Sequence, residues 1–116
     1  LGRDTYDPDW KIKRRLSRDV SGIQMEVKCF PMRRIGKIKK KQLCYLVFTD
    51  SGVSLVQSHL LKAALVRKLE PGQIVPDVQE GLTAYSVELK EAPKPVELVF
   101  GRVYTEKLDE IKSRLK

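Results

Sequence analysis

Among the side chains that could bind a ligand or take part in a reaction, the basic ones cluster most strongly in this sequence of 116 residues. Twelve of the 23 lysines and arginines lie between Lys11 and Lys41, where only Asp19 and Glu26 oppose them. That stretch carries a net +10 in a chain whose total charge is +8, so the remainder is slightly acidic. Charge segregated in this way attracts polyanions to one face, either nucleic acid or an anionic membrane surface. A charge that serves only solubility needs no such segregation.

Seven of these cations form the candidate ligand-binding set, because they precede or fill the connection between two expected strands. They are Lys28, Arg33, Arg34, Lys37, Lys39, Lys40 and Lys41. If the connection projects from the fold, these side chains converge on one anionic partner, a membrane lipid headgroup or an acidic protein surface. The alternative partner is single- or double-stranded nucleic acid. A single strand requires exposed aromatic side chains for base stacking, and Phe30 and Tyr104 are the candidates.

The residues that could act in catalysis or bind a metal ion form no comparable cluster in the sequence. His59 is the only histidine, and Cys29 and Cys44 fall in expected strands, where buried inert thiols are typical. The sequence has no GxSxG, Walker, HExxH or dinucleotide-binding motif and no CxxC pair. We therefore expect a non-catalytic binding module that uses no cofactor and no metal ion.

Length and composition predict one globular domain. Hydrophobic residues make up 41% of the chain, enough for a core, but no apolar run approaches the roughly 20 residues that cross a bilayer. The N-terminus is charged and has no signal-like apolar stretch, which predicts an intracellular protein, cytoplasmic or nuclear, or peripheral at a membrane. Because the chain begins without a methionine, we expect it to be part of a larger protein.

The sequence divides into a basic N-terminal segment and a longer segment with the pattern of a folded domain. We expect residues 1–21 to be a basic N-terminal extension with a short helix, and residues 22–116 to be a single β-barrel domain that ends in an amphipathic helix. Alternating apolar residues predict a strand over 23–29. The run Leu43-Cys44-Tyr45-Leu46-Val47-Phe48 is apolar on both faces, which favours a central strand, and a third strand follows over 53–56.

The second half of the chain predicts a hairpin and a closing helix. Residues 58–69 fit either a helix or a short strand at 64–66, and residues 73–75 fit a brief strand. The alternating segments 83–89 and 96–100 predict a hairpin with one face on a core. A helix capped by Thr105 is expected to follow, with Leu108, Ile111 and Leu115 on its apolar stripe.

Several short strands followed by one amphipathic C-terminal helix resemble the pleckstrin-homology superfold. The run from Lys39 to Gly52 is similar to the basic loop, second strand and tight turn of that family, residues 71–75 to its short middle strand, and residues 85–115 to its closing hairpin and capping helix. The resemblance implies an antiparallel β sandwich or barrel plugged by the helix. It also implies phosphoinositide binding through Lys28 on the first strand and Lys39 and Lys41 at the entry to the second.

This sequence departs from the family at two places. The usual tryptophan of the final helix is replaced by an aliphatic stripe, and lysine stands where arginine is usual in the phosphate-binding pattern. Lysine holds a phosphate as a point charge, whereas arginine grips it with two parallel hydrogen bonds. The rival architecture is an oligonucleotide-binding (OB) barrel with an extra C-terminal hairpin and helix, in which residues 58–69 would be the helix between strands three and four.

Overall fold

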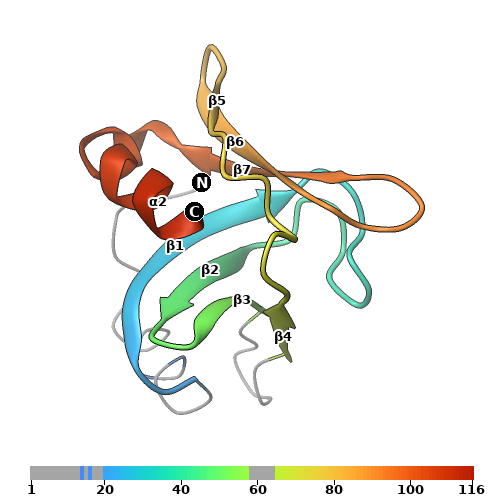
Figure 1. Cartoon of the computed structure of the whole chain (residues 1–116). Helices are drawn as coiled ribbons and strands as arrows, with labels where there is room; N and C mark the ends of the chain where they lie inside the picture. The colour runs from blue at the N-terminus through green and yellow to red at the C-terminus, as the bar shows by residue number, and fades with distance from the viewer. Residues whose placement is uncertain (1–13, 15, 17–19, 58–64) are drawn as a thin grey trace.

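The computed structural model of the chain describes residues 14, 16, 20–57 and 65–116, and it is mostly β (Figure 1). Among these residues, seven strands and a C-terminal helical segment follow one another along the chain. The strands are β1 (Ile23–Pro31), β2 (Cys44–Thr49), β3 (Gly52–Gln57), β4 (Leu65–Leu69), β5 (Gln79–Glu80), β6 (Ala84–Leu89) and β7 (Val96–Gly101). The helical segment consists of the 3-10 helix η1 (Arg102–Lys107) and the α-helix α2 (Leu108–Leu115). The expected fold class, an antiparallel β structure with a C-terminal helix, is confirmed.

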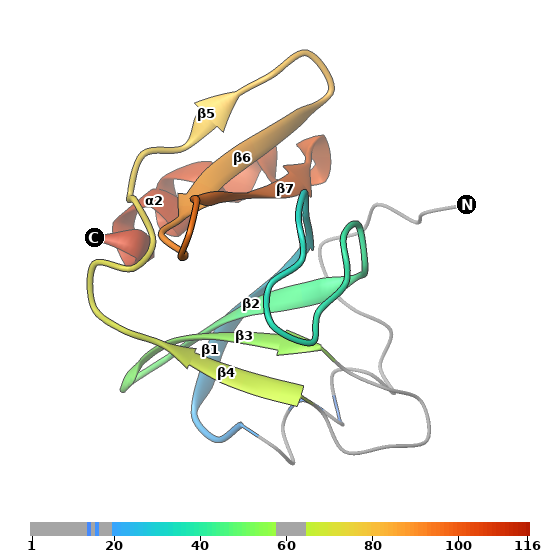
Figure 2. The ribbon, with the colours of Figure 1, turned by 90° about the vertical axis from the view of Figure 1, so that its right-hand side faces the viewer.

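All seven strands belong to one antiparallel sheet of order β4-β3-β2-β1-β7-β6-β5. The sheet folds over into two layers because the long strand β1 belongs to both, pairing with β2 from Ile23 to Cys29 and with β7 at Phe30 and Pro31 (Figure 2). β4 and β5 are the two edges and are not paired with each other, so the described sheet is not closed into a barrel. The β barrel that the sequence predicts is therefore not formed by the described strands, which make one open sheet.

The core explains why these segments form strands. Met25, Val27 and Cys29 alternate along β1 and point inward, while β2 is buried on both faces, as its uninterrupted apolar run predicts. Its inward side chains join the main core. Its outward side chains Tyr45 and Val47 form a second cluster with Val56 and with Leu16, which is fully buried. Leu16 thus packs on the sheet from within the segment that the sequence assigns to an extension.

The structure shows the secondary structure of part of residues 58–69 and of residues 73–75. Residues 65–69 form strand β4 beside β3, and residues 58–64 lie outside the described part of the chain, as does most of the expected N-terminal helix. The expected strand at 73–75 is reduced to one bridge between Ile74 and Leu89. The short strand β5 further along was not predicted, because Gln79 and Glu80 are exposed and have no apolar alternation.

The closing helix does not begin where the sequence indicates. A 3-10 helix covers residues 102–107, and α2 begins at Leu108 with Lys107 as its cap residue. Thr105 lies inside the 3-10 turn, where its hydroxyl donates to the Arg102 carbonyl at 2.6 Å and lies 2.8 Å from the Tyr85 hydroxyl. The predicted stripe is nevertheless correct, since Ile111 and Leu115 are buried and Leu108 packs against the core.

Candidate anion-binding site

The connection between β1 and β2, residues 32–43, carries six of the seven candidate cations and is called the basic loop below. Two aliphatic residues fix it to the body of the protein, because Ile35 and Ile38 are each only 1% exposed and belong to the main core. Their backbones exchange two hydrogen bonds of 2.9 Å around the turn Gly36-Lys37. Gly36 has φ +58°, a left-handed conformation that favours glycine. The first half of the loop is therefore a small anchored hairpin.

A second tight turn follows at residues 39–42. The Lys39 amide donates to the side-chain oxygen of Gln42, and the Gln42 amide donates to the Lys39 carbonyl, both at 3.1 Å. Lys41 has φ +61°, a conformation that side-chain-bearing residues seldom adopt. Its amide donates to the Pro31 carbonyl at 2.7 Å and ties the end of the loop to the end of β1. Local hydrogen bonds thus hold the lysine-rich half as well.

The two arginines of the basic loop support its backbone. The Arg33 guanidinium donates to the Pro95 carbonyl in the connection between β6 and β7, and the Arg34 Nε donates to the Gly36 carbonyl at 2.9 Å. The Met32 amide also donates to the Glu97 carbonyl at 2.9 Å. The Arg33 and Met32 contacts hold the start of the basic loop against the β6–β7 hairpin at one end of the molecule (Figure 1). Lys94, an exposed residue of the β6–β7 connection, is a candidate that the sequence analysis missed.

The lysines of the basic loop are differently placed from its arginines. Within the described part of the chain, no carboxylate pairs with the side chains of the four exposed lysines Lys37, Lys39, Lys40 and Lys41. Lys28 lies outside the loop, on β1 opposite Tyr45, and its side chain is half-buried. Its backbone amide donates to the Tyr104 hydroxyl at 2.8 Å. The structure therefore brings six of the seven candidate residues together and leaves Lys28 on the strand before them.

The candidate residues for base stacking fit less well. Tyr104 is only 2% exposed, packs edge-on against Phe100 with ring centroids 5.9 Å apart, and accepts the Lys28 amide. The prediction that Tyr104 is free to stack on a base is therefore wrong. Phe30 is half-buried on β1, where it pairs with Val99 of β7. His59 lies outside the described residues.

The root of the basic loop contains both cysteines. Cys29 and Cys44 are direct partners across β1 and β2, are fully buried, and have their Sγ atoms 3.6 Å apart. The hydrogen bond with Cys44 and burial raise the pKa of the Cys29 thiol well above its usual value. This thiol is therefore protonated at neutral pH, which agrees with the expectation of buried thiols in strands.

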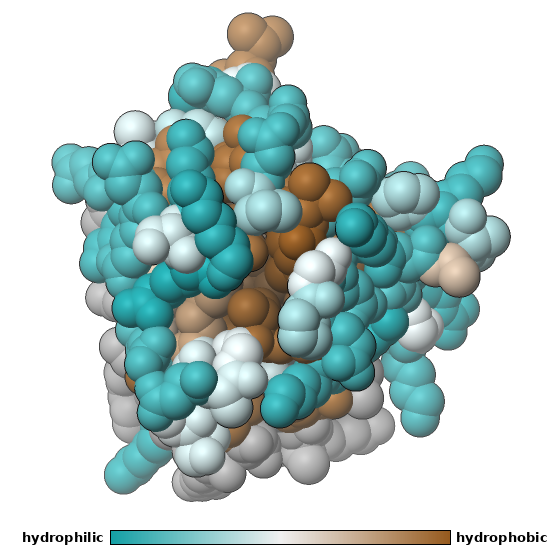
Figure 3. All heavy atoms as spheres, viewed as in Figure 1, coloured by the Kyte–Doolittle hydropathy of each residue, from teal (hydrophilic) through white to brown (hydrophobic). Residues whose placement is uncertain are grey.

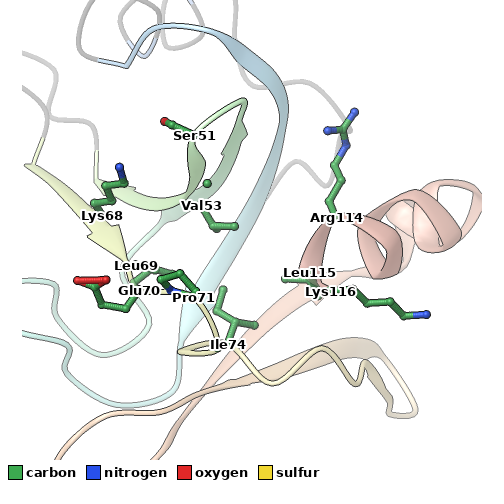
Figure 4. Close-up of a pocket in the computed structure, with 12 residues that line it drawn as sticks. Ser51, Val53, Lys68, Leu69, Glu70, Pro71, Ile74, Arg114, Leu115 and Lys116 are labelled. Carbon is green, nitrogen blue, oxygen red and sulfur yellow. The ribbon is translucent and has the colours of Figure 1, made fainter.

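A cavity of about 420 Å³ opens between the two layers, away from the basic loop, and is called the interlayer cavity below. Val53, Leu69, Ile74 and Leu115 form its apolar part, and Figure 4 shows Leu115 coming from α2 and Val53 from β3. Its rim combines Lys68, Arg114 and Lys116 with Glu70. Figure 3 shows brown apolar surface at the bottom of a hollow that hydrophilic residues border.

A second cavity of about 420 Å³ lies on β5, β6 and β7 and has an acidic lining that includes Asp77, Glu88 and Glu97. Glu88 and Glu97 are direct cross-strand partners, an arrangement in which like charges repel. Neither cavity is lined by any residue of the basic loop. The cations of the loop therefore lie outside both hollows.

Comparison with known proteins gives no assignment: no protein-family model matches the chain, and no curated protein matches it significantly. Within the described ranges, no group of three histidine, cysteine or acidic residues is arranged to hold a metal ion. The helices described here are all too short or too polar to cross a bilayer. The case for a function therefore depends on the geometry of the basic loop.

Proposed function

We propose that this chain is a non-catalytic binding module whose basic loop binds an anionic partner, with a phosphoinositide-containing membrane as the first choice and an acidic protein surface as the second. The observation that carries the proposal is the set of four exposed lysines on a loop that Ile35 and Ile38 anchor in the core. A loop already held in one conformation loses little entropy when it binds. Its ammonium groups are paired with no carboxylate of the described residues, so binding breaks no ion pair within that part of the chain.

The different roles of the arginines and lysines in the basic loop favour a partner whose surface has a high density of negative charge. Because Arg33 and Arg34 donate to backbone carbonyls of the protein, the loop meets its partner mainly with lysines. Lysines act as compact point charges and contribute about 1 kcal/mol each near an anionic bilayer. The loop also lines neither described cavity, which suits contact with a surface better than enclosure of a small ligand.

The order of the elements supports the pleckstrin-homology-like interpretation over the OB alternative. A four-stranded layer, a three-stranded layer and a terminal helix beside β1 match the arrangement that the resemblance implies. The OB interpretation requires a helix over residues 58–69, and residues 65–69 form strand β4 instead. Binding of single-stranded nucleic acid also loses one of its two candidate stacking residues, because Tyr104 is buried.

Vesicle binding tests the proposal. The chain is mixed with phosphatidylcholine vesicles that contain or lack a phosphoinositide, and the bound fraction is measured by sedimentation. We expect binding only to the anionic vesicles, competition by free inositol hexakisphosphate, and a loss of about a hundredfold in affinity when Lys39, Lys40 and Lys41 are changed to alanine. A matched variant removes Lys68, Lys112 and Lys116, which lie on β4 and at the end of α2.

The other partners give distinct results in the same assay. Binding to an acidic peptide without binding to vesicles would replace the membrane by a protein partner. Affinity that grows with oligonucleotide length, without a response to the inositol phosphate, would support the nucleic-acid alternative. Equal losses in the two triple variants would contradict the role of the basic loop.

A further inference from the structure

The two cysteines occupy the last rung of the β1–β2 ladder. Their Sγ atoms are 3.6 Å apart, both are free thiols, and both are fully buried. Direct partners in an antiparallel pair have Cα atoms about 4.5–5.5 Å apart, which falls within the roughly 4.4–6.8 Å span of disulfides. The backbone is therefore already placed for a bond, and only the sulfur atoms must approach each other.

The pair also encloses a single structural unit. The residues between Cys29 and Cys44 comprise the end of β1 and the whole basic loop, including the anchors Ile35 and Ile38. A bond between the two sulfur atoms would close a covalent ring around the loop. No other covalent bond is needed to fix the two ends of the loop at its root.

We propose that Cys29 and Cys44 are a site of reversible oxidation, at which an intramolecular disulfide locks the root of the basic loop. The pair is accessible only when the last rung opens, because neither thiol is exposed in the closed ladder. The raised pKa of Cys29 further disfavours the reactive thiolate until that opening occurs. Oxidation of the two thiols is therefore expected to be slow, and the disulfide is buried once the rung closes again.

The oxidant is a low-molecular-weight disulfide such as oxidised glutathione. One cysteine thiolate attacks it, forms a mixed disulfide and releases the first glutathione thiolate. The second cysteine then attacks the protein sulfur of the mixed disulfide and expels the second glutathione. Two protein thiols are oxidised to one disulfide, one glutathione disulfide is reduced to two thiols, and the two protons pass to the released glutathione.

The disulfide would limit the conformations of the unfolded chain and would also fix the two ends of the basic loop to each other. A disulfide that closes a ring of this size is expected to raise the melting temperature by roughly 10 °C. Any effect on anion binding rests on the proposed function, because it assumes that the loop is the binding surface. The oxidation itself does not rest on that function and is measured without an anionic ligand.

Intact mass spectrometry tests the inference on the folded chain. The chain is incubated with oxidised glutathione, quenched in acid, and alkylated under denaturing conditions. We expect both thiols to disappear together, leaving a monomer that has lost two hydrogen atoms and carries no glutathione. Dithiothreitol should restore both thiols and reverse the increase in melting temperature. Cys29→Ala and Cys44→Ala, each unable to close the ring, should instead accumulate the mixed disulfide or a dimer.

Three results would overturn the inference. The wild-type chain could keep both thiols while a small reference thiol in the same tube is fully oxidised. It could also carry one glutathione on each cysteine, or form the internal disulfide with a fall in melting temperature. The vesicle assay is then repeated on the two redox forms. A disulfide without any vesicle binding would contradict the proposed function and leave the oxidation site intact.

Discussion

The basic loop and the interlayer cavity differ in what each offers a ligand. The basic loop has four exposed lysines without a described carboxylate partner, yet it lines neither cavity. The interlayer cavity has an apolar interior, but its three rim cations are accompanied by Glu70, and Arg114 bonds Glu110 at 3.0 Å and Gln24 at 2.7 Å. The lysines of the basic loop thus lie outside both described cavities. A partner recognised by charge meets the loop on an open surface.

The interlayer cavity and the basic loop also differ in how they contact the main core. The interlayer cavity is part of the space between the layers, since Leu69, Ile74 and Leu115 belong to the main cluster. The basic loop reaches that cluster through Ile35 and Ile38, and its cations point to solvent. Changes near the cavity should therefore act on stability. Changes to the lysines should act on binding alone, and the following experiments test this difference.

The largest effect is expected from Ile111→Asp on α2. Ile111 is 1% exposed, and a buried charge without a partner costs several kcal/mol, comparable with the roughly 5–15 kcal/mol that stabilises a domain. The variant should be unfolded or nearly so by circular dichroism. Ser113→Asp places the same charge on an exposed position of the same helix and should stay folded. A folded Ile111→Asp protein would contradict the docking of α2 on the core.

The next largest effect is expected from Ile38→Ala in the basic loop. Removal of a buried isoleucine side chain costs about 2–5 kcal/mol, which denaturant unfolding would measure. The released loop should also bind anionic vesicles more weakly, although every lysine is retained, because it must be ordered on binding. Lys37→Ala, at the neighbouring exposed position, should leave stability within about 0.5 kcal/mol of wild type. Unchanged stability of Ile38→Ala would show that the loop is not anchored.

The smallest effect is expected from Arg33→Lys, which keeps the charge and removes the guanidinium that contacts Pro95. If Arg33 supports the loop, vesicle affinity should fall less than about fivefold, because surface contacts of this kind are worth about 1 kcal/mol or less. Amide hydrogen exchange at residues 32–34 should become faster, as the link to the β6–β7 connection is weakened. A loss as large as that of the lysine variant would instead make Arg33 a ligand contact.

Local patterns predicted most of the fold. Alternation along β1, β6 and β7 and the fully apolar run of β2 fixed their positions to within a few residues, because burial imposes a period of two on a strand. β5 lacks such a signal, since Gln79 and Glu80 are exposed. The start of the closing helix was missed because Thr105 uses its hydroxyl inside a 3-10 turn and does not cap α2.

The candidate site was predictable in composition but not in geometry. The count of lysines and arginines identified the basic loop, yet nothing local shows that Ile35 and Ile38 reach the core or that Arg33 contacts Pro95, 62 residues away in sequence. These contacts depend on the folding of the sheet at β1. The same long-range packing buries Tyr104 and brings Pro95, the residue after Lys94, into contact with Arg33. Composition alone predicts neither feature.

The most direct measurement is the affinity for phosphoinositide vesicles between about 50 mM and 200 mM salt, for wild type and the two triple variants. Both variants lose three positive charges. The loop variant loses Lys39, Lys40 and Lys41, and the cavity variant loses Lys68 and Lys116, which line the interlayer cavity, together with Lys112 of α2. We predict that the loop variant loses about a hundredfold in affinity and most of the salt dependence at an unchanged melting temperature, while the cavity variant stays within about threefold of wild type. Parallel affinity curves for the two variants would contradict the account.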